Sequence, residues 1–411
     1  MVKSLNMSSK FTIMNPKIYK AALYAIFLIP LCALTIAIGL YELSHPFLNW
    51  DLLPYAGLVE KLRHANNSEI HDNAYFDVYS YAKAHSSILA DNWNQLITGQ
   101  YRVDNLKSTD VFLAQLPFYS CKPFYIILLS WVSYLTTSIT RAAIYISVAS
   151  VFMSTCFMVI FSYIKKIPIL ISLIIGLLFF LNPIIFETAR FQTPDALALA
   201  FTTLAAIFFL LDLEKCAAII FLLAILVRPD IELFCVIMAI FMVFSNLFEN
   251  TRFSKAAIII LFCSVVLKSF IYHYYGAYGY LTLIKFSLIT GQVDFPNLLN
   301  VSNIGFVDFL KIYRNVLTIP YFYMCHTYLI VLSLAGLAIY FIIDKKPLQL
   351  GKSEILYISL VAYTIAHILL FPLLDARYFS PVLSMAFLIM IDKISIYYSN
   401  RASDHVQSHK G

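Results

Sequence analysis

The sequence predicts an all-α, polytopic membrane protein, and three observations support this fold class. Hydrophobic residues fill 61% of the 411 positions, while charged residues fill 13%, about half the roughly 25% typical of soluble domains. Mean hydropathy is +0.78, and apolar runs long enough to cross a bilayer recur along the chain. This composition excludes a water-soluble enzyme and a disordered chain, and a net charge of +6 is too weak for a nucleic-acid-binding protein.

The apolar runs predict about ten transmembrane helices in a single membrane domain that covers residues 1–411. The first run follows four lysines and has no small-residue cleavage site, so we expect it to remain as the first span. The shortest run, 216–227, is expected to end inside the membrane or to continue past a polar junction. The ten spans are expected near residues 21–42, 142–164, 167–186, 196–211, 216–227, 231–247, 256–273, 321–343, 354–372 and 379–398.

The basic residues predict the orientation of this topology. When both termini and alternate connections are placed in the cytoplasm, that side holds 15 basic and seven acidic groups, a net charge of +8. The other side holds the remaining 14 basic and 16 acidic groups, a net charge of −2. The positive-inside rule therefore predicts cytoplasmic termini, and we expect the chain to lie in a bacterial cytoplasmic membrane.

Two large loops lie on the predicted outer side, at about residues 43–122 and 274–320, and we expect the functional site on this extracytoplasmic face. In the first loop, stretches such as LLPYAGLVEKL have the pattern of short interfacial helices that lie along a membrane surface. Residues 123–140 are apolar enough to span, but a span there would invert every later connection. We interpret them as a re-entrant or surface-lying helix, with an extra span as the alternative.

Charged residues recur at the predicted outer ends of the spans, where charges are costly and usually functional. Taken singly, each has a structural interpretation, because a carboxylate can cap a helix, Arg-Pro-Asp is a reasonable turn and interfacial arginines extend toward water. Ten groups of mixed sign on one face of an apolar protein favour a functional site instead. They are Asp51, Lys122, Glu187, Arg190, Asp195, Arg228, Asp230, Glu232, Asp375 and Arg377.

Glycosyl transfer from a lipid-phosphate donor requires such a mixture of charges. A carboxylate accepts the proton of the acceptor, and cations hold and stabilise the leaving phosphate in a pocket of low dielectric. We therefore expect a catalytic pair of carboxylates, Asp51 and Asp195. The cations expected to bind the donor phosphate are Lys122, Arg377 and Arg190, and the candidate substrate-binding residues are Glu187, Tyr55 and Tyr378.

This layout resembles the GT-C superfamily of polyprenyl-phosphate-sugar-dependent glycosyltransferases, which includes the protein O-mannosyltransferases and the lipid A aminoarabinose transferases. Four features carry the resemblance in order along the chain: Asp51, the KPFY stretch that begins at Lys122, ARFQTPDALALAF and DARYFSP. The resemblance implies that Asp51 is the base, Asp195 the second active-site carboxylate, and Lys122 and Arg377 the phosphate-binding cations.

The same resemblance indicates two further points. Arg228 and Asp230, in VRPD, match a common junction of the superfamily and are expected to be structural. The first loop of the family often carries two neighbouring acidic residues, whereas the next acidic residue after Asp51 is Glu60. This departure leaves the role of a divalent metal open, and no other cofactor is assigned.

The leading functional hypothesis is an inverting enzyme that transfers a hexosyl or pentosyl group from a polyprenyl-phosphate donor to a lipid or glycan acceptor. An O-antigen-type polymerase or ligase is the alternative, although residues 274–320 lack the arginine-rich character usual for such enzymes. A flippase or transporter would show related halves and charges near the midplane, and neither pattern is evident. Metal ligation by His64, His71 and His85 is disfavoured because their spacing lacks a tight ligand pair.

Overall fold

The protein is all helical in the part that the computed structural model describes, which confirms the predicted class. The described residues are 47–63, 66–84, 99–248, 252–284, 351–371 and 375–408, with isolated positions within 26–41 and 307–314. Five helical segments in them are long and apolar enough to cross a membrane, or six if one bent pair counts as a span. They are α8 (Ile139–Ile164), α13 (Ile231–Phe248), α14 (Lys255–Tyr274), α19 (Lys352–Leu370) and the Arg377–Tyr398 segment at the start of α20 (Ser380–Ser408).

A helical membrane protein is thus supported, whereas the count of about ten spans is not confirmed. The run predicted as a span at 167–186 is two helices, α9 (Ile169–Phe180) and α10 (Pro183–Arg190), bent by 56°. Pro183 begins α10 and the side chain of Asn182 caps it, so the apolar run is broken by local backbone chemistry. The predicted span 321–343 lies outside the described residues, as do ten of the 22 positions of 21–42.

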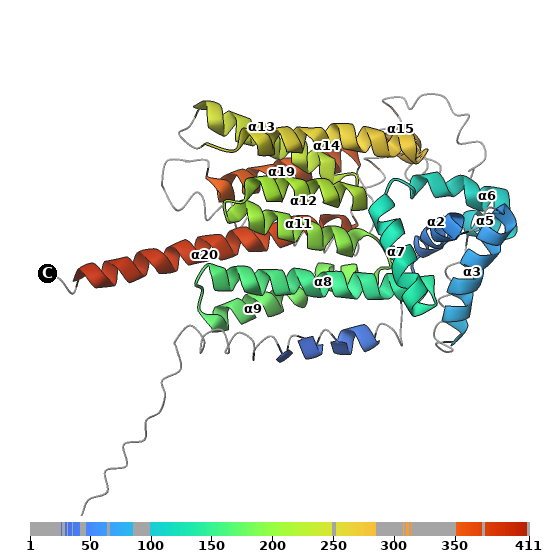
Figure 1. The fold of residues 1–411 in the computed structure, drawn as a ribbon, viewed down its shortest axis with the longest axis horizontal. Coiled ribbons are helices and arrows are strands. Elements are labelled where there is room, and N and C mark those ends of the chain that lie inside the picture. The colour runs from blue at the N-terminus through green and yellow to red at the C-terminus, as the bar shows by residue number, and fades with distance from the viewer. Residues whose placement is uncertain are drawn as a thin grey trace, which may run out of the picture.

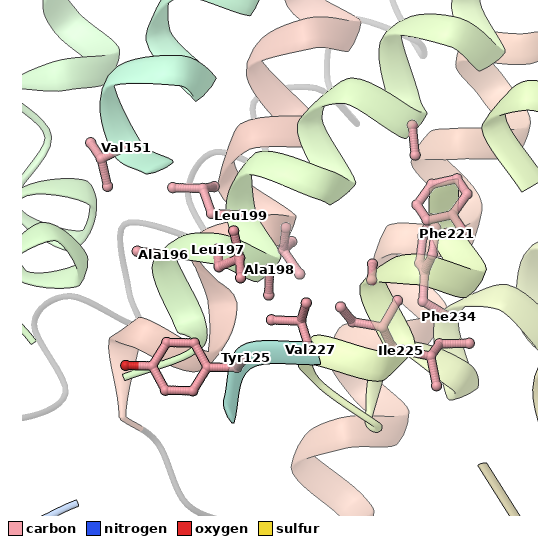
Figure 2. Close-up of a cluster of buried hydrophobic side chains, with 14 of the residues drawn as sticks. Tyr125, Val151, Ala196, Leu197, Ala198, Leu199, Phe221, Ile225, Val227 and Phe234 are labelled. Atoms are coloured by element: carbon pink, nitrogen blue, oxygen red, sulfur yellow. The ribbon is translucent and has the colours of Figure 1, made fainter. Parts of the chain in front are cut away.

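Helix α11 (Asp195–Leu210) lies at the centre of the bundle, where it packs against α8, α12 (Glu214–Val227) and α20. Its sequence DALALAFTTLAA supplies alanines that let neighbouring helices approach closely. Thr202 and Thr203 satisfy their hydroxyls on backbone carbonyls of the same helix. Figure 2 shows Leu197 and Leu199 of α11 in the apolar core that α12 and α13 complete.

Six short elements from residues 52–136 gather at one end of the bundle (Figure 1). The segment LLPYAGLVEKL forms α2 (Leu52–Arg63), as a short helix was expected. Nine of its 12 residues are buried in the protein, so the expectation that this helix lies on a membrane surface is wrong. In α3, Asp77 accepts hydrogen bonds from the backbone N–H groups of Ile139 and Thr140, which fixes this layer to the start of α8. The elements are α2 (Leu52–Arg63), α3 (Asn67–Ala84), α5 (Gln100–Lys107), α6 (Thr109–Gln115), η1 (Leu116–Phe118) and α7 (Pro123–Thr136).

Helix α7 contains the segment predicted to be re-entrant or surface-lying. It runs across the end of the bundle, roughly perpendicular to α8 (Figure 1). Its 14 residues give a length of about 21 Å, short of the roughly 30 Å hydrocarbon core of a bilayer. Trp131, Tyr134 and Leu135 are strongly exposed on its outer side, as expected for an interfacial helix.

Charged residues concentrate at the two opposite ends of the bundle. At the end away from α7, Lys165 pairs with Asp392 at 2.6 Å and Lys352 pairs with Glu214 at 3.0 Å. These four residues belong to connections and span ends assigned to the cytoplasm by the sequence. The other end holds the residues assigned to the outer side, about 22 Å away along α20. The alternation of span ends therefore agrees with the predicted topology, and the cytoplasmic assignment itself stays a prediction.

Candidate functional site

Arg377 lies at the centre of the charged cluster at the α7 end of the bundle. It belongs to η3 (Ala376–Phe379), a turn that leads into α20. Its guanidinium contacts three carboxylates: Nη2 lies 3.1 Å from Asp51 Oδ2, and Nε lies 2.8 Å from Asp375 Oδ2 and 3.9 Å from Asp195 Oδ2. Arg377 is buried, and its Nη1 has no hydrogen-bond partner among the described residues. The two N–H bonds of Nη1 therefore remain for an acceptor that a ligand would bring.

Asp51 is held in place from three sides. The side chain of Asn49 accepts a hydrogen bond from the Asp51 backbone N–H, a turn that aims the carboxylate away from α2. The backbone N–H of Asn49 donates to Gln192 Oε1 at 3.2 Å, which ties this loop to the segment before α11. Tyr119 Oη donates to Asp51 Oδ1 at 3.0 Å. With 24% of its side chain exposed, Asp51 remains accessible to a substrate.

Asp195 occupies a more enclosed position at the first turn of α11. Its side chain is 6% exposed and accepts a hydrogen bond from Thr193 Oγ1 at 2.7 Å. Arg228 Nη1 lies 3.1 Å from Asp195 Oδ1, and the same guanidinium makes a bidentate contact with Asp230. The expected structural pair from VRPD thus orients one of the two carboxylates predicted to be catalytic.

Asp230 connects the Asp195–Arg228 pair to helix α19. Its Oδ2 accepts a hydrogen bond from Tyr363 Oη at 2.9 Å and lies 3.9 Å from His367 Nδ1. Burial of the carboxyl opposes ionisation, but Arg228 and His367 outweigh it and lower the pKa of Asp230 to about 2. Asp230 is therefore a permanent anion at neutral pH.

Lys122 is the N-cap residue of α7, and the Tyr119 ring lies near both its ammonium and the Asp51 carboxylate. Its ammonium donates a hydrogen bond to Tyr55 Oη and lies 5.1 Å from the Tyr55 ring and 5.4 Å from the Tyr119 ring. Burial, followed by the charge of Asp51, raises the pKa of both phenols, so both stay neutral: Tyr119 donates to Asp51, and Tyr55 accepts from Lys122. No carboxylate among the described residues lies within ion-pair distance of Lys122, which leaves its charge available to an anion.

Of the remaining predicted residues, Tyr378 contacts this centre directly. The Tyr378 ring lies 5.2 Å from the Arg377 guanidinium and 5.1 Å from that of Arg228. Arg190 and Glu187 lie on α10, and the Arg190 guanidinium lies over the ring of Phe47 at 5.6 Å. Gln192 Nε2 donates to the backbone carbonyl of Arg190, which connects α10 to the loop of Asp51.

The described residues contain no group of three His, Cys, Asp or Glu side chains that could hold a metal ion. His71 is buried, and its Nε2 lies 3.0 Å from the backbone oxygen of Asn105. His64 and His85 lie outside the described residues. The structure therefore gives no support to the open question of a divalent metal in the part of the chain that it describes.

Sequence reasoning missed four residues of the site: Gln192, Tyr119, Tyr363 and His367. Tyr363 and His367 had a detectable signal, because both carry polar groups and lie at i and i+4 of a predicted span, where they share one helix face. Tyr119 and Gln192 act through contacts with Asp51 and Asn49, which are distant in sequence. No motif marks such contacts.

The site combines four carboxylates, Asp51, Asp195, Asp230 and Asp375, with three cations, Lys122, Arg228 and Arg377. Most of these charges neutralise one another. The groups best placed to meet a substrate are Asp51, which is partly exposed, and Lys122, which has no carboxylate partner among the described residues. Such a pair can accept a proton and bind an anion. Comparisons of the chain with protein-family models, with curated proteins and with solved structures find no match.

Proposed function

We propose that the protein is a membrane glycosyltransferase of the GT-C type. It would transfer a sugar from a polyprenyl-phosphate donor to a hydroxyl of a lipid or glycan acceptor on the extracytoplasmic face. The observation that carries this proposal is the arrangement around Asp51, whose carboxylate lies between the Tyr119 hydroxyl and the Arg377 guanidinium. Lys122 lies over the ring of the same Tyr119 and has no carboxylate partner in the part of the chain that the structure describes. A proton acceptor and an anion-binding cation are the two groups that this transfer requires.

In the proposed reaction, the acceptor hydroxyl oxygen attacks the anomeric carbon of the sugar while its proton passes to Asp51. The bond between that carbon and the phosphate oxygen breaks, and its electron pair leaves with the polyprenyl phosphate. Lys122 and Arg377 Nη1 stabilise the charge that develops on this leaving group. Attack opposite to the departing phosphate inverts the configuration of the sugar.

The contacts of Asp195 support a role different from that of Asp51. Asp195 is almost enclosed and faces both Arg228 and Arg377, so we assign it to positioning these guanidinium groups. Both guanidinium groups also lie over the ring of Tyr378, which helps to hold them in position. Asp51 is then the single base, and Arg190 lies farther out as a secondary donor-binding candidate.

Release of polyprenyl phosphate from polyprenyl-phosphate-linked sugars, measured with the full chain in proteoliposomes, tests this proposal. Asp51→Asn keeps the size of the side chain but removes its basicity, so we expect transfer to fall by about 10²–10⁴-fold. Asp110→Asn, an exposed carboxylate of α6, is the matched control and should retain parental transfer. Equal transfer by the Asp51→Asn and Asp110→Asn proteins would exclude the proposed mechanism.

A further inference from the structure

The hydroxyl of Tyr125 is a buried donor that the proposed mechanism does not use. Tyr125 is the third residue of α7 and is fully buried, and its ring packs edge-on against Tyr55 with centroids 5.0 Å apart. Its Oη has no hydrogen-bond partner among the described residues. Figure 2 shows the ring at the border of the apolar core, with its oxygen directed away from the labelled core side chains.

A hydroxyl that is buried without a partner destabilises a fold, because it loses its hydrogen bonds with water. Phenylalanine would fill the same space at this position without that cost. The hydroxyl therefore indicates either an internal water or an acceptor atom that a ligand brings.

The start of α7 supplies further donors beside this hydroxyl. Lys122 is the N-cap residue and Pro123 follows at the first helical position, and no side chain caps the helix. The backbone N–H groups of Phe124 and Tyr125 thus lie at an uncapped, electropositive helix end, a common site for phosphate. Side chains of a helix lean toward its N-terminus, and both Tyr125 and Lys122 contact the Tyr55 ring.

We propose that the Tyr125 hydroxyl, with Lys122 and the first turn of α7, binds the phosphate of a prenyl-phosphate lipid. This inference rests on the proposed function and adds a specific donor to it. The hydroxyl has no accessible surface, so a neighbouring group has to move when the phosphate enters. We assign this movement to Lys122, whose flexible four-carbon stem lets the ammonium leave Tyr55 and follow the anion.

Tyr125→Phe is a clean test because it removes one oxygen that has no partner among the described residues. Binding of farnesyl phosphate to the purified full chain in detergent micelles should weaken by about tenfold in this variant, the usual loss for a hydrogen bond to a charged group. Its melting temperature should not fall below that of the parent. The control is Tyr397→Phe, which removes the hydroxyl of an exposed tyrosine of α20 and should change neither quantity.

Each result decides the proposal. Parental affinity in Tyr125→Phe would overturn it and favour an internal water, and a lower melting temperature would show that the hydroxyl has a partner within the fold. If farnesyl phosphate binds the parent and weakens in Lys122→Gln while Tyr125→Phe is unaffected, the proposed function stands and the role of Tyr125 falls. If the parent binds no farnesyl phosphate, both fall. Equal competition by inorganic phosphate would exclude a lipid as the ligand.

Discussion

Replacement of Arg228 by glutamine should destabilise the protein strongly, because this side chain compensates two carboxylates at once. Its guanidinium lies 3.1 Å from Asp195 Oδ1 and 2.7 Å from Asp230 Oδ2. Loss of one partner from a buried ion pair costs about 3–5 kcal/mol. The Asp230 side chain is 29% exposed and its charge is partly screened, whereas that of Asp195 is 6% exposed. We therefore expect a loss of about 3 kcal/mol, mostly from Asp195.

Reversible unfolding of the full chain in mixed micelles of increasing SDS content measures this free energy. Adding Asp195→Asn to the Arg228→Gln protein removes the uncompensated charge and should restore at least about 1 kcal/mol. Lys61→Gln, an exposed cation in the last turn of α2, is the control and should change the free energy by less than about 0.5 kcal/mol. A loss below about 1 kcal/mol for Arg228→Gln, or simple additivity in the double variant, would refute the assigned pairing.

Three further outcomes are expected. The pKa of Asp230 in the folded protein is about 2, below its ordinary 3.8, so its contribution to stability is complete above pH 4 and declines as the pH falls through 2. Thermal unfolding across this pH range should therefore show a smaller loss of stability on acidification for Asp230→Asn than for the parent. Asp77→Ala removes the acceptor of two backbone N–H groups in the first turn of α8, whose N-cap is Ser138, and should lower the unfolding free energy by about 1–2 kcal/mol; a smaller effect would exclude this contact as a major one. Gln192→Leu frees the loop of Asp51 from its tether and should lower kcat more than it changes KM in the transfer assay; unchanged kcat would show that Asn49, Tyr119 and Arg377 orient the carboxylate without Gln192.

The sequence was sufficient to predict the helical class and the residues that meet at one end of the bundle. Asp51, Asp195 and Arg377 were predicted from their places at span ends, and the structure brings these three side chains together. Helices alternate in direction, so the position of a span end in the sequence determines the end of the bundle where it lies. Average hydropathy could not predict the bend at Pro183, because flanking apolar residues hide a single local break.

Burial was the property that the sequence could not supply. Asp51 and Asp195 have equivalent patterns in the chain, yet four times as much of the Asp51 side chain is exposed, at 24% against 6%. The difference arises from the neighbours that surround each carboxylate, above all Arg228. The same limitation hid Tyr125, which looks like one more aromatic residue of an apolar helix until its hydroxyl is seen to lack a partner in the described structure.

The order in which the ion pairs become available has a consequence for assembly of the chain on the ribosome. The partner of Asp195, Arg228, lies in the connection between α12 and α13 and is synthesised soon after Asp195. Asp51 pairs with Arg377, roughly 330 residues later, which corresponds to about 15–65 s of translation. During that interval Tyr119 can already donate its hydrogen bond to Asp51, but the charge of Arg377 is still absent. The nascent protein therefore completes the ion pair of the proposed base late, when the start of α20 has emerged.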